Sequence, residues 1–391
     1  MIRLRSGGAA ALALLLTLCG AMARAEDAEV TITARLFRVK TVPFEKGLSD
    51  EKRLALRLVF DRDDVATLEA LLKESGGKCV ATARAKQAPT LALADRHTEA
   101  YVRDMDLEID SNGVRGEPVK GEFTWGLMLN ASGVEMDGAR NVKMTLTGSA
   151  CLPHAERRTT KTEGGNVDLP GFATLSGSIP LVVPPGGAAI LGASDLEDPA
   201  HTVVLVVGTD AEPTAANVAN GGHGVALWWL DLPGKDADAL LKAAPQPPAI
   251  GPDQAARARK ARARLWAFAP TCDSALVLDV SSDQAIVRDY DEEMAGGTAA
   301  WDTVIGGYQE SVHIRLEGTK IKLDAEVVDR PIAEKKVADG KKKVPDPVRV
   351  SVAAGSDAPL EPDEGDWLLQ VRNPMGIPLG ALLVSLRGRD R

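Results

Sequence analysis

The sequence predicts a mainly β fold, a β-rich α+β chain with one well-formed helix, arranged as two tandem units. Short runs alternate apolar and polar residues, turn residues separate these runs, and short motifs recur in the same order later in the chain. Alternation with a period of two marks strands with one buried and one solvated face. The alternating runs are Val30–Val39, Lys143–Thr147, Val312–Leu316 and Lys320–Asp324. The turn signals are Ser111–Gly113, Ala131–Gly133, Glu317–Gly318 and Asp339–Gly340.

The first residues have the layout of a secretory signal peptide. Met1–Arg5 is basic, Ala9–Leu18 is apolar, and Ala23–Ala25 forms a small-residue cleavage site. The apolar run is shorter than the roughly 20 residues that span a bilayer as a helix, which disfavours a membrane anchor. We therefore expect residues 1–25 to be removed and the mature chain to be exported.

The charge of the chain excludes two classes of partner. The sequence has 46 Lys and Arg residues against 55 Asp and Glu residues. Removal of residues 1–25 takes away Arg3, Arg5 and Arg24, which leaves 43 basic and 55 acidic residues, a net charge of −12. Nucleic acid and anionic lipid both require a basic surface, so we expect neither as a partner.

Three cysteines stay in the mature chain: Cys79, Cys151 and Cys272. This odd, sparse set is not a disulfide framework, and no C-x-x-C pair is present for zinc. Two interpretations stay open. One is a Cys79–Cys151 disulfide, which export permits; the other is separate thiols, buried as small apolar residues.

One helix is predicted in the first unit. Val65, Leu68, Leu71 and Leu72 form an apolar stripe at helical spacing. Asp61 or Asp63 can cap its beginning, and Gly76–Gly77 ends it.

A linker and a second helix divide the chain. Ala244–Pro252 is the clearest linker, and a basic helix around Asp253–Arg264 follows it. The predicted organisation is a signal peptide (1–25), a first β domain (26–232), a linker with the basic helix (233–262) and a second, shortened β domain (263–391).

The second unit repeats the first. Glu99–Asp104 returns as Gln284–Asp289, an offset of 185 in residue number, and Ala34–Phe37 returns as Ala263–Trp266, an offset of 229. Along the chain the offset falls from 229 to 185, which predicts that the first unit has extra chain between these matches, namely the helix near Val65–Glu74 and the strand after it. Later matches are looser: Pro180–Leu191 with Pro359–Leu369, and the apolar end strands His201–Gly208 and Gly380–Leu386.

Five segments in order carry a family resemblance. Val30–Val39 resembles V-x-V-E-A-x-I-x-E-V, Leu68–Val80 a helix with a following "gkv" strand, and Ala88–Ala100 the stretch S-P-x-L-x-x-x-D-N-Q-E-A. Phe123–Leu129 is similar to G-x-x-L-x-V, and Val182–Gly192 to d-G-x-x-V-V-L-G-G. These patterns belong to the C-terminal domain of the secretins, outer-membrane channel proteins of type II and type III secretion systems and of type IV pili.

The resemblance covers roughly residues 30–208, with a diverged copy after it. It implies a β-rich domain exported in a Gram-negative-type bacterium, periplasmic or associated with the outer membrane, with a part in protein secretion.

The stretch Asp104–Asp110 alternates strictly between acidic and apolar residues. Its four carboxylates lie on one strand face, while Met105, Leu107 and Ile109 face a core. A calcium site is one interpretation, although Val119 stands where a calcium loop has a bidentate Glu. The other is a plain hairpin turn at Asp110–Gly113.

No catalytic signature is present, so we predict no catalytic, cofactor-binding or metal residues and no cofactor. The histidines have no metal-ligand spacing, and no G-x-S-x-G, G-x-G-x-x-G or nucleophilic cysteine with a base is found. His313 is expected on an exposed strand face and His223 in a flexible loop. Lys335–Lys343 is expected to form a solvated hairpin tip, and the tryptophans a core.

We therefore expect a non-enzymatic cell-envelope protein that acts by assembly or protein binding. Its partners would be other proteins or copies of itself, with peripheral association where it meets the outer membrane. The alternative is an extracytoplasmic module that binds glycan or peptide without a channel role. In that case the second half, with Trp301 and Trp367, would form the binding surface.

Overall fold

The computed structural model describes most of the chain between residues 30 and 387. The described residues are 30–48, 56–86, 88–110, 113–162, 164–195, 198, 200–212, 223–230, 249–250, 263–271, 275–295, 298–317, 320–329, 335–336, 342–343, 348–355, 364–372 and 378–387. The expected signal peptide, 1–25, and nearly all of the expected linker, 233–262, lie outside them.

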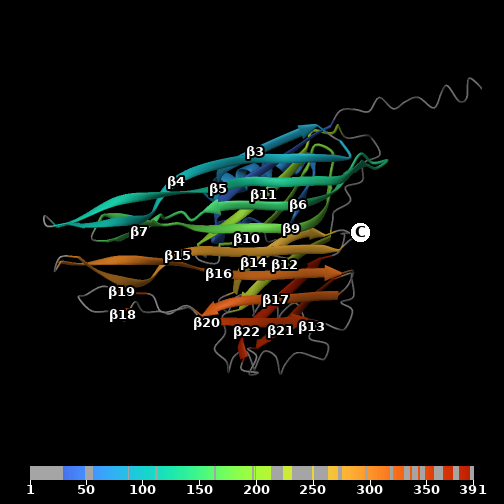
Figure 1. Ribbon diagram of the computed structural model, residues 1–391. Coiled ribbons are helices and arrows are strands. Elements are labelled where there is room, and N and C mark those ends of the chain that lie inside the picture. Colours follow the sequence, from blue (N-terminus) through green and yellow to red (C-terminus); the bar gives the residue numbers. More distant parts are fainter. Residues whose placement is uncertain are drawn as a thin grey trace, which may run out of the picture.

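Eight strands form an antiparallel sheet that we call the hairpin sheet, since two long hairpins make up half of it (Figure 1). From one edge to the other its strands are β4 (Thr90–Asp110), β5 (Gly113–Met136), β6 (Val142–Pro153), β9 (Gly171–Val183), β15 (Leu276–Ala295), β16 (Thr298–Glu317), β17 (Lys320–Asp329) and β20 (Val348–Gly355).

The second large sheet, which we call the helix-covered sheet, is also antiparallel. Its order is β3 (Lys78–Lys86), β1 (Thr31–Lys40), β11 (His201–Thr209), β10 (Ala188–Ser194), β14 (Ala263–Thr271), β12 (His223–Leu230), β22 (Pro378–Arg387), β21 (Glu364–Arg372) and β13 (Ala249–Ile250), with β2 (Val59–Phe60) also paired to β10. Two small hairpins complete the strands: β7 (Arg158–Lys161) with β8 (Asn166–Leu169), and β18 (Lys335–Lys336) with β19 (Lys342–Lys343). The prediction of a mainly β fold is confirmed.

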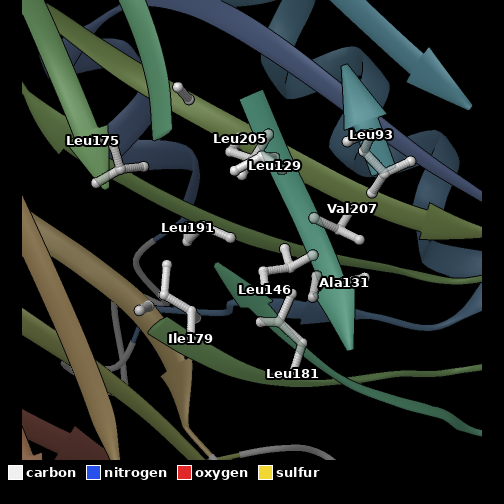
Figure 2. Packing of buried hydrophobic residues seen from close by; sticks show 14 of the residues in the cluster. Leu93, Leu129, Ala131, Leu146, Leu175, Ile179, Leu181, Leu191, Leu205 and Val207 are labelled. Atoms are coloured by element: carbon white, nitrogen blue, oxygen red, sulfur yellow. The ribbon is translucent and has the colours of Figure 1, made fainter. Parts of the chain in front are cut away.

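The main core lies between the two sheets and follows from the alternation along their strands. Figure 2 shows apolar side chains of both sheets meeting there. From the hairpin sheet come Leu93, Leu129, Ala131, Leu146, Leu175, Ile179 and Leu181, and from the helix-covered sheet Leu191, Leu205 and Val207. Burial of a leucine of this kind contributes about 1.5–3 kcal/mol.

A second core covers the other face of the helix-covered sheet. Two helices lie over this face, α2 (Thr41–Leu48) and α3 (Val65–Glu74), and a short 3-10 helix, η1 (Arg62–Asp64), precedes α3. Phe44 of α2 and Leu68 of α3 are fully buried there beside Phe268 of β14. Strands such as β11 are therefore apolar on both faces, because each face meets a core.

The predicted helix is confirmed as α3, and its end at a glycine is confirmed by Gly76, with φ of +68°. The predicted side-chain cap is wrong. Asp61 precedes η1 without a side-chain hydrogen bond, and Asp63 lies within η1. The Asp61 backbone carbonyl accepts from the backbone N–H of Val65 instead, at 3.1 Å.

Two further expectations are corrected. Ala131–Gly133 is no turn: it lies within β5, where a register shift and a φ of +59° at Gly133 bend the strand. Ala263 and Arg264, expected at the end of the basic helix, begin β14 because they pair with β12. The rest of that helix lies outside the described residues.

The two long hairpins are built alike. The first turns between Asp110 and Gly113, and the second between Ala295 and Thr298. At both positions the residue numbers of the two turns differ by the offset of the sequence repeat that relates Glu99 to Gln284. Figure 1 shows both hairpins extending beyond the rest of the sheet on the same side of the molecule.

Each hairpin also carries the same irregularity. The register shifts between Val102 and Asp104 in β4, and between Val287 and Asp289 in β15. The extra residue of this β-bulge is Arg103 in one hairpin and Arg288 in the other, again separated by the repeat offset. The repeated sequence Val-Arg-Asp therefore encodes a repeated bulge.

The remaining strands follow the repeat in order. β17, β20, β21 and β22 occupy in the second repeat the places of β6, β9, β10 and β11 in the first. The earlier strands correspond as well. The order β14, β12, β22, β21 in the second repeat matches β3, β1, β11, β10 in the first, and β13 pairs with β21 as β2 pairs with β10. β14 is therefore the counterpart of β3, so the predicted match of Ala34–Phe37 with Ala263–Trp266 is wrong, and so is the prediction that this strand belongs to the first unit alone. The chain between β12 and β14 lies almost wholly outside the described residues, so the prediction for the helix stays a prediction.

Both sheets run through both repeats. β9 pairs with β15 in the hairpin sheet, and β10 pairs with β14 in the helix-covered sheet. β12, within the predicted first domain, lies between β14 and β22 of the second repeat. The predicted boundary at 233–262 falls almost wholly outside the described residues and stays a prediction.

We expect the helix layer to stabilise the fold strongly. Leu68→Ala removes a fully buried side chain beneath α3, so it should lower the free energy of unfolding by about 2–5 kcal/mol. Urea denaturation measures this change. Lys73→Ala, on the exposed side of the same helix, should have little effect, and equal effects of both substitutions would contradict the assigned packing.

Candidate functional site

A polar cluster lies between the sheets where the two repeats meet. His154 follows β6, Asp195 follows β10, and Ser282 lies in β15. The Nε2 atom of His154 is 3.1 Å from Ser282 Oγ and 3.3 Å from Asp195 Oδ1. The side chains of His154 and Asp195 are only 8 % and 2 % exposed. The cluster thus contains the three residue types of a hydrolase triad, and its geometry decides whether they can act as one.

The geometry is that of a structural cluster. In a triad the serine and the carboxylate contact opposite nitrogens of the imidazole, whereas here both contact Nε2. The other nitrogen, Nδ1, faces Gln284 Oε1 at 3.2 Å. Ser282 is fully buried, so its hydroxyl is closed to a substrate. The cluster joins the sheets by satisfying buried polar groups.

Gln284 fixes the orientation of the ring. Its amide nitrogen donates to the carbonyls of Leu169 and Ala285, at 3.2 and 2.8 Å, which leaves Oε1 as the acceptor for His154 Nδ1. Gly171 provides the space, because a Cβ there would lie 2.3 Å from Gln284 Oε1 and 2.4 Å from His154 Nδ1.

Arg38 of β1 extends the cluster into the helix-covered sheet. Its guanidinium donates to the carbonyl of Pro153. Burial lowers the pKa of Arg38, and the carboxylates of Asp195 and Asp198 act to raise it. Asp198 also contacts His201 Nδ1 at 2.6 Å. Charge is thus balanced between β1 and the segment that joins β10 to β11.

Sequence reasoning missed this cluster, because its members are far apart in the chain and none belongs to a motif. The one available signal was the repeat, in which Gln284 matches Glu99. Glu99 forms an ion pair with Arg157, and Gln284 contacts His154. Both matched side chains therefore contact the segment after β6.

The acidic strand face is exposed as predicted at Asp106 and Glu108. The predicted core on its reverse side is wrong. Met105 is buried beside Gly164 and Gly165 and belongs to neither core, while Leu107 and Ile109 are only half-buried. Pairing of Asp110 with Gly113 confirms the hairpin turn. Within the part of the chain that the structure describes, no group of three or more His, Cys, Asp or Glu residues is arranged to hold a metal ion.

The described cysteines are free, so the Cys79–Cys151 disulfide is wrong. Cys79 is exposed on β3. Cys151 accepts a hydrogen bond from Thr174 Oγ1 at 3.4 Å, and burial raises the pKa of its thiol. Cys272 lies outside the described residues.

The other candidate residues are dispersed. His223 begins β12 rather than lying in a loop, because it pairs with Thr271 of β14. His313 is 45 % exposed and contacts Asp279 on the neighbouring strand. Trp228 is buried in the second core, as expected.

The remaining expectations fall partly outside the described residues. The side chains of Trp229, Trp266, Trp301 and Trp367 are not among them. The lysine-rich hairpin is present as β18 paired with β19, and its tip lies outside.

Comparisons with protein-family models, with curated proteins and with solved structures found no match. Among the described residues, no helix is both long and apolar enough to cross a membrane.

Gly171→Ala tests the packing of the cluster. The added methyl must displace His154 or Gln284, so we expect a loss of about 1–3 kcal/mol in the free energy of unfolding. The matched control is Gly138→Ala, since a Cβ there meets nothing within 4 Å. Thermal denaturation compares the two, and an unchanged melting temperature for Gly171→Ala would contradict the contact.

Asp283, beside the cluster, predicts a pH dependence. Burial raises the pKa of its carboxyl, and His154 acts to lower it. A carboxyl whose pKa is raised in the folded state contributes to the free energy of unfolding, and this contribution is complete below the ordinary pKa of about 4. That contribution is lost as the pH rises through the raised value. Asp283→Asn should therefore be more stable than the native chain at neutral pH, and the difference should vanish in acid.

Urea denaturation across this pH range measures the difference, with Asp106→Asn on the exposed strand face as the control. The expectation would be contradicted if Asp283→Asn were less stable than the native chain at neutral pH and the two were equally stable in acid.

Proposed function

We propose that this chain is a non-enzymatic, secretin-like protein of the cell envelope that works by assembly through its β-sheets. The observation that carries the proposal is the strand pairing between the repeats. Gly171–Ser178 of β9 pairs along its whole length with Val277–Gln284 of β15. This continuous pairing shows that the edge strand of one β unit can pair with the edge strand of a second unit of the same fold.

The chemistry of the interior supports a role without catalysis. In the described part of the chain, the grouping most like an active site is the His154 cluster, and its arrangement is that of a buried joint. The acidic residues of β4 also have a structural explanation. They alternate with apolar residues along the strand, of which Met105 is buried.

Export and a part in protein secretion complete the proposal. They rest on the signal-peptide pattern of residues 1–25 and on the resemblance of residues 30–208 to the secretin domain. The location is then periplasmic or at the outer membrane. The side chains of Trp301 and Trp367, on which the glycan- or peptide-binding alternative depends, lie outside the described residues, so no specific observation favours that alternative.

The proposal predicts association of the mature chain, residues 26–391. Size-exclusion chromatography with light scattering, together with native mass spectrometry, should detect species larger than one chain. Their share should grow with protein concentration, since association follows mass action. A single chain at every concentration, including conditions that retain the native circular dichroism spectrum, would overturn the proposal.

A further inference from the structure

The hairpin sheet ends in two strands that belong to different repeats. β4 is its last strand on one side and β20 its last strand on the other. In Figure 1 the two lie at opposite sides of the molecule. Among the described residues, each pairs within the sheet with one neighbour only, β5 and β17 respectively. Each therefore presents a second row of backbone donors and acceptors.

The repeat identifies what each edge corresponds to. β15 is the counterpart of β4, with Gln284 in the place of Glu99, and β9 is the counterpart of β20. Inside the molecule β9 and β15 pair with each other. The edge strands β20 and β4 are thus the repeat counterparts of β9 and β15, two strands that pair with each other inside the molecule.

Strand registers fix the equivalence of β6 and β17. Ser132 of β5 pairs with Thr145 of β6. The counterpart of Ser132 at the repeat offset is Glu317, which pairs with Lys320 of β17. Thr145 and Lys320 are therefore equivalent, and two positions further along each strand so are Thr147 and Lys322.

Comparing the β6–β9 register with the β17–β20 register in the same way fixes the equivalence of β9 and β20. Thr147 pairs with Ser178, and Lys322 pairs with Gly355, so Ser178 and Gly355 are equivalent. The part of β9 that pairs with β15 is Gly171–Ser178. Its counterpart, counted back from Gly355, is Val348–Gly355, which is the whole of β20. The free strand has the length that the known junction uses.

We propose that β20 of one molecule pairs antiparallel with β4 of a second copy of this chain, in the register of the β9–β15 junction. Val348–Gly355 of the first molecule would face Ala92–Glu99 of the second, with Gly355 opposite Ala92 and Val348 opposite Glu99. This inference rests on the proposed function and names its partner. It also predicts a direction, because each molecule offers one edge of each kind.

The register preserves the inner and outer faces of the sheet. In β15 the buried inner residues include Leu278, Ser282 and Gln284. At the repeat offset Leu278 corresponds to Leu93, which is fully buried in the main core. Ala94, next along β4, is exposed. A slip of one residue would exchange the faces, so this register is specified by the core.

The helix-covered sheet has the corresponding strands at its outer ends. Inside the molecule β10 pairs with β14, through Gly192 and Ala193 opposite Phe268 and Ala267. The counterpart of β14 is the edge strand β3, and the counterpart of β10 is β21, with which β13 pairs only at Trp367 and Asp366. The strands of the internal junction thus have counterparts at the outer ends of both sheets.

β3 and β4 are also joined to each other. The carboxylate of Asp95, on β4, accepts a hydrogen bond from the backbone N–H of Thr82 on β3 at 2.7 Å. This contact holds the edge strand of one sheet beside the edge strand of the other.

Engineered cysteines test the register. Cα atoms directly opposite each other in antiparallel strands are about 4.5–5.5 Å apart, within the range of a disulfide, about 4.4–6.8 Å. In a Cys79→Ser background, Ala94→Cys chains mixed with Ala353→Cys chains should form a disulfide-linked heterodimer under mild oxidation. A chain with both substitutions should form a ladder of covalent multimers, and peptide mass spectrometry identifies the bond.

The matched control moves one cysteine two positions along the same strand. Ser351→Cys lies diagonal to Ala94→Cys, where the separation is about 7–8 Å, so it should cross-link far less. Circular dichroism establishes that each variant is folded. A disulfide between two Ala94→Cys chains, in place of the heterodimer, would overturn the direction of the contact.

The outcomes separate this inference from the proposed function. Multimers seen by light scattering without a bond between positions 94 and 353 would overturn the register and leave assembly standing. Preferential bonding of Ala94→Cys to Ser351→Cys would do the same. A chain that stays single under all conditions would overturn both. A heterodimer bond between positions 94 and 353, with multimers in the unmodified protein, supports both.

Discussion

The pairing of β9 with β15 is the contact on which the rest of the structure depends. It turns two four-stranded units into one sheet of eight strands, and it carries the main core across the boundary between the repeats. Its backbone hydrogen bonds contribute only about 1 kcal/mol each. The larger effect is indirect, because the pairing buries Leu278 and Val280 against side chains of the first repeat. Without it, each unit would expose an edge and an open end of its core.

The polar cluster follows from the same contact. Ser282 and Gln284 lie in the paired stretch of β15, and both are buried because β15 continues the sheet of the first repeat. Burial then requires partners for their polar atoms, which His154 and the backbone around Leu169 provide. The burial of this stretch of β15 therefore explains why a serine, a histidine and an aspartate lie together.

Much of the architecture could be predicted from the sequence, since alternation reports which face of a strand is buried. The strand at Lys143–Thr147 and the helix at Val65–Glu74 are examples. The reach of the hairpins could not be predicted. Gly113–Glu122 contains Gly116, Pro118 and Gly121 and shows no alternation, yet it forms a strand because β4 pairs with it throughout. Pairing with a partner outweighs local propensity there.

Tertiary contacts also explain α2, a short segment with Pro43 and Gly47, both poor helix formers. It is helical because Phe44 and Leu48 enter the second core. The His154 cluster brings together residues from both repeats, and no spacing in the chain records such proximity.

The bulge has a consequence for how the repeats have diverged. Beyond it, the first hairpin continues from Asp104 to its turn at Asp110, and the second from Asp289 to Ala295, so the two stretches are equally long. Strands elsewhere differ in length between the repeats: β9 has 13 residues, whereas its counterpart β20 has 8. The two arms thus have equal reach past the bulge, roughly 24 Å at about 3.4 Å per residue. Divergence has changed their sequences and kept their length, so the two hairpins end at the same distance from their bulges.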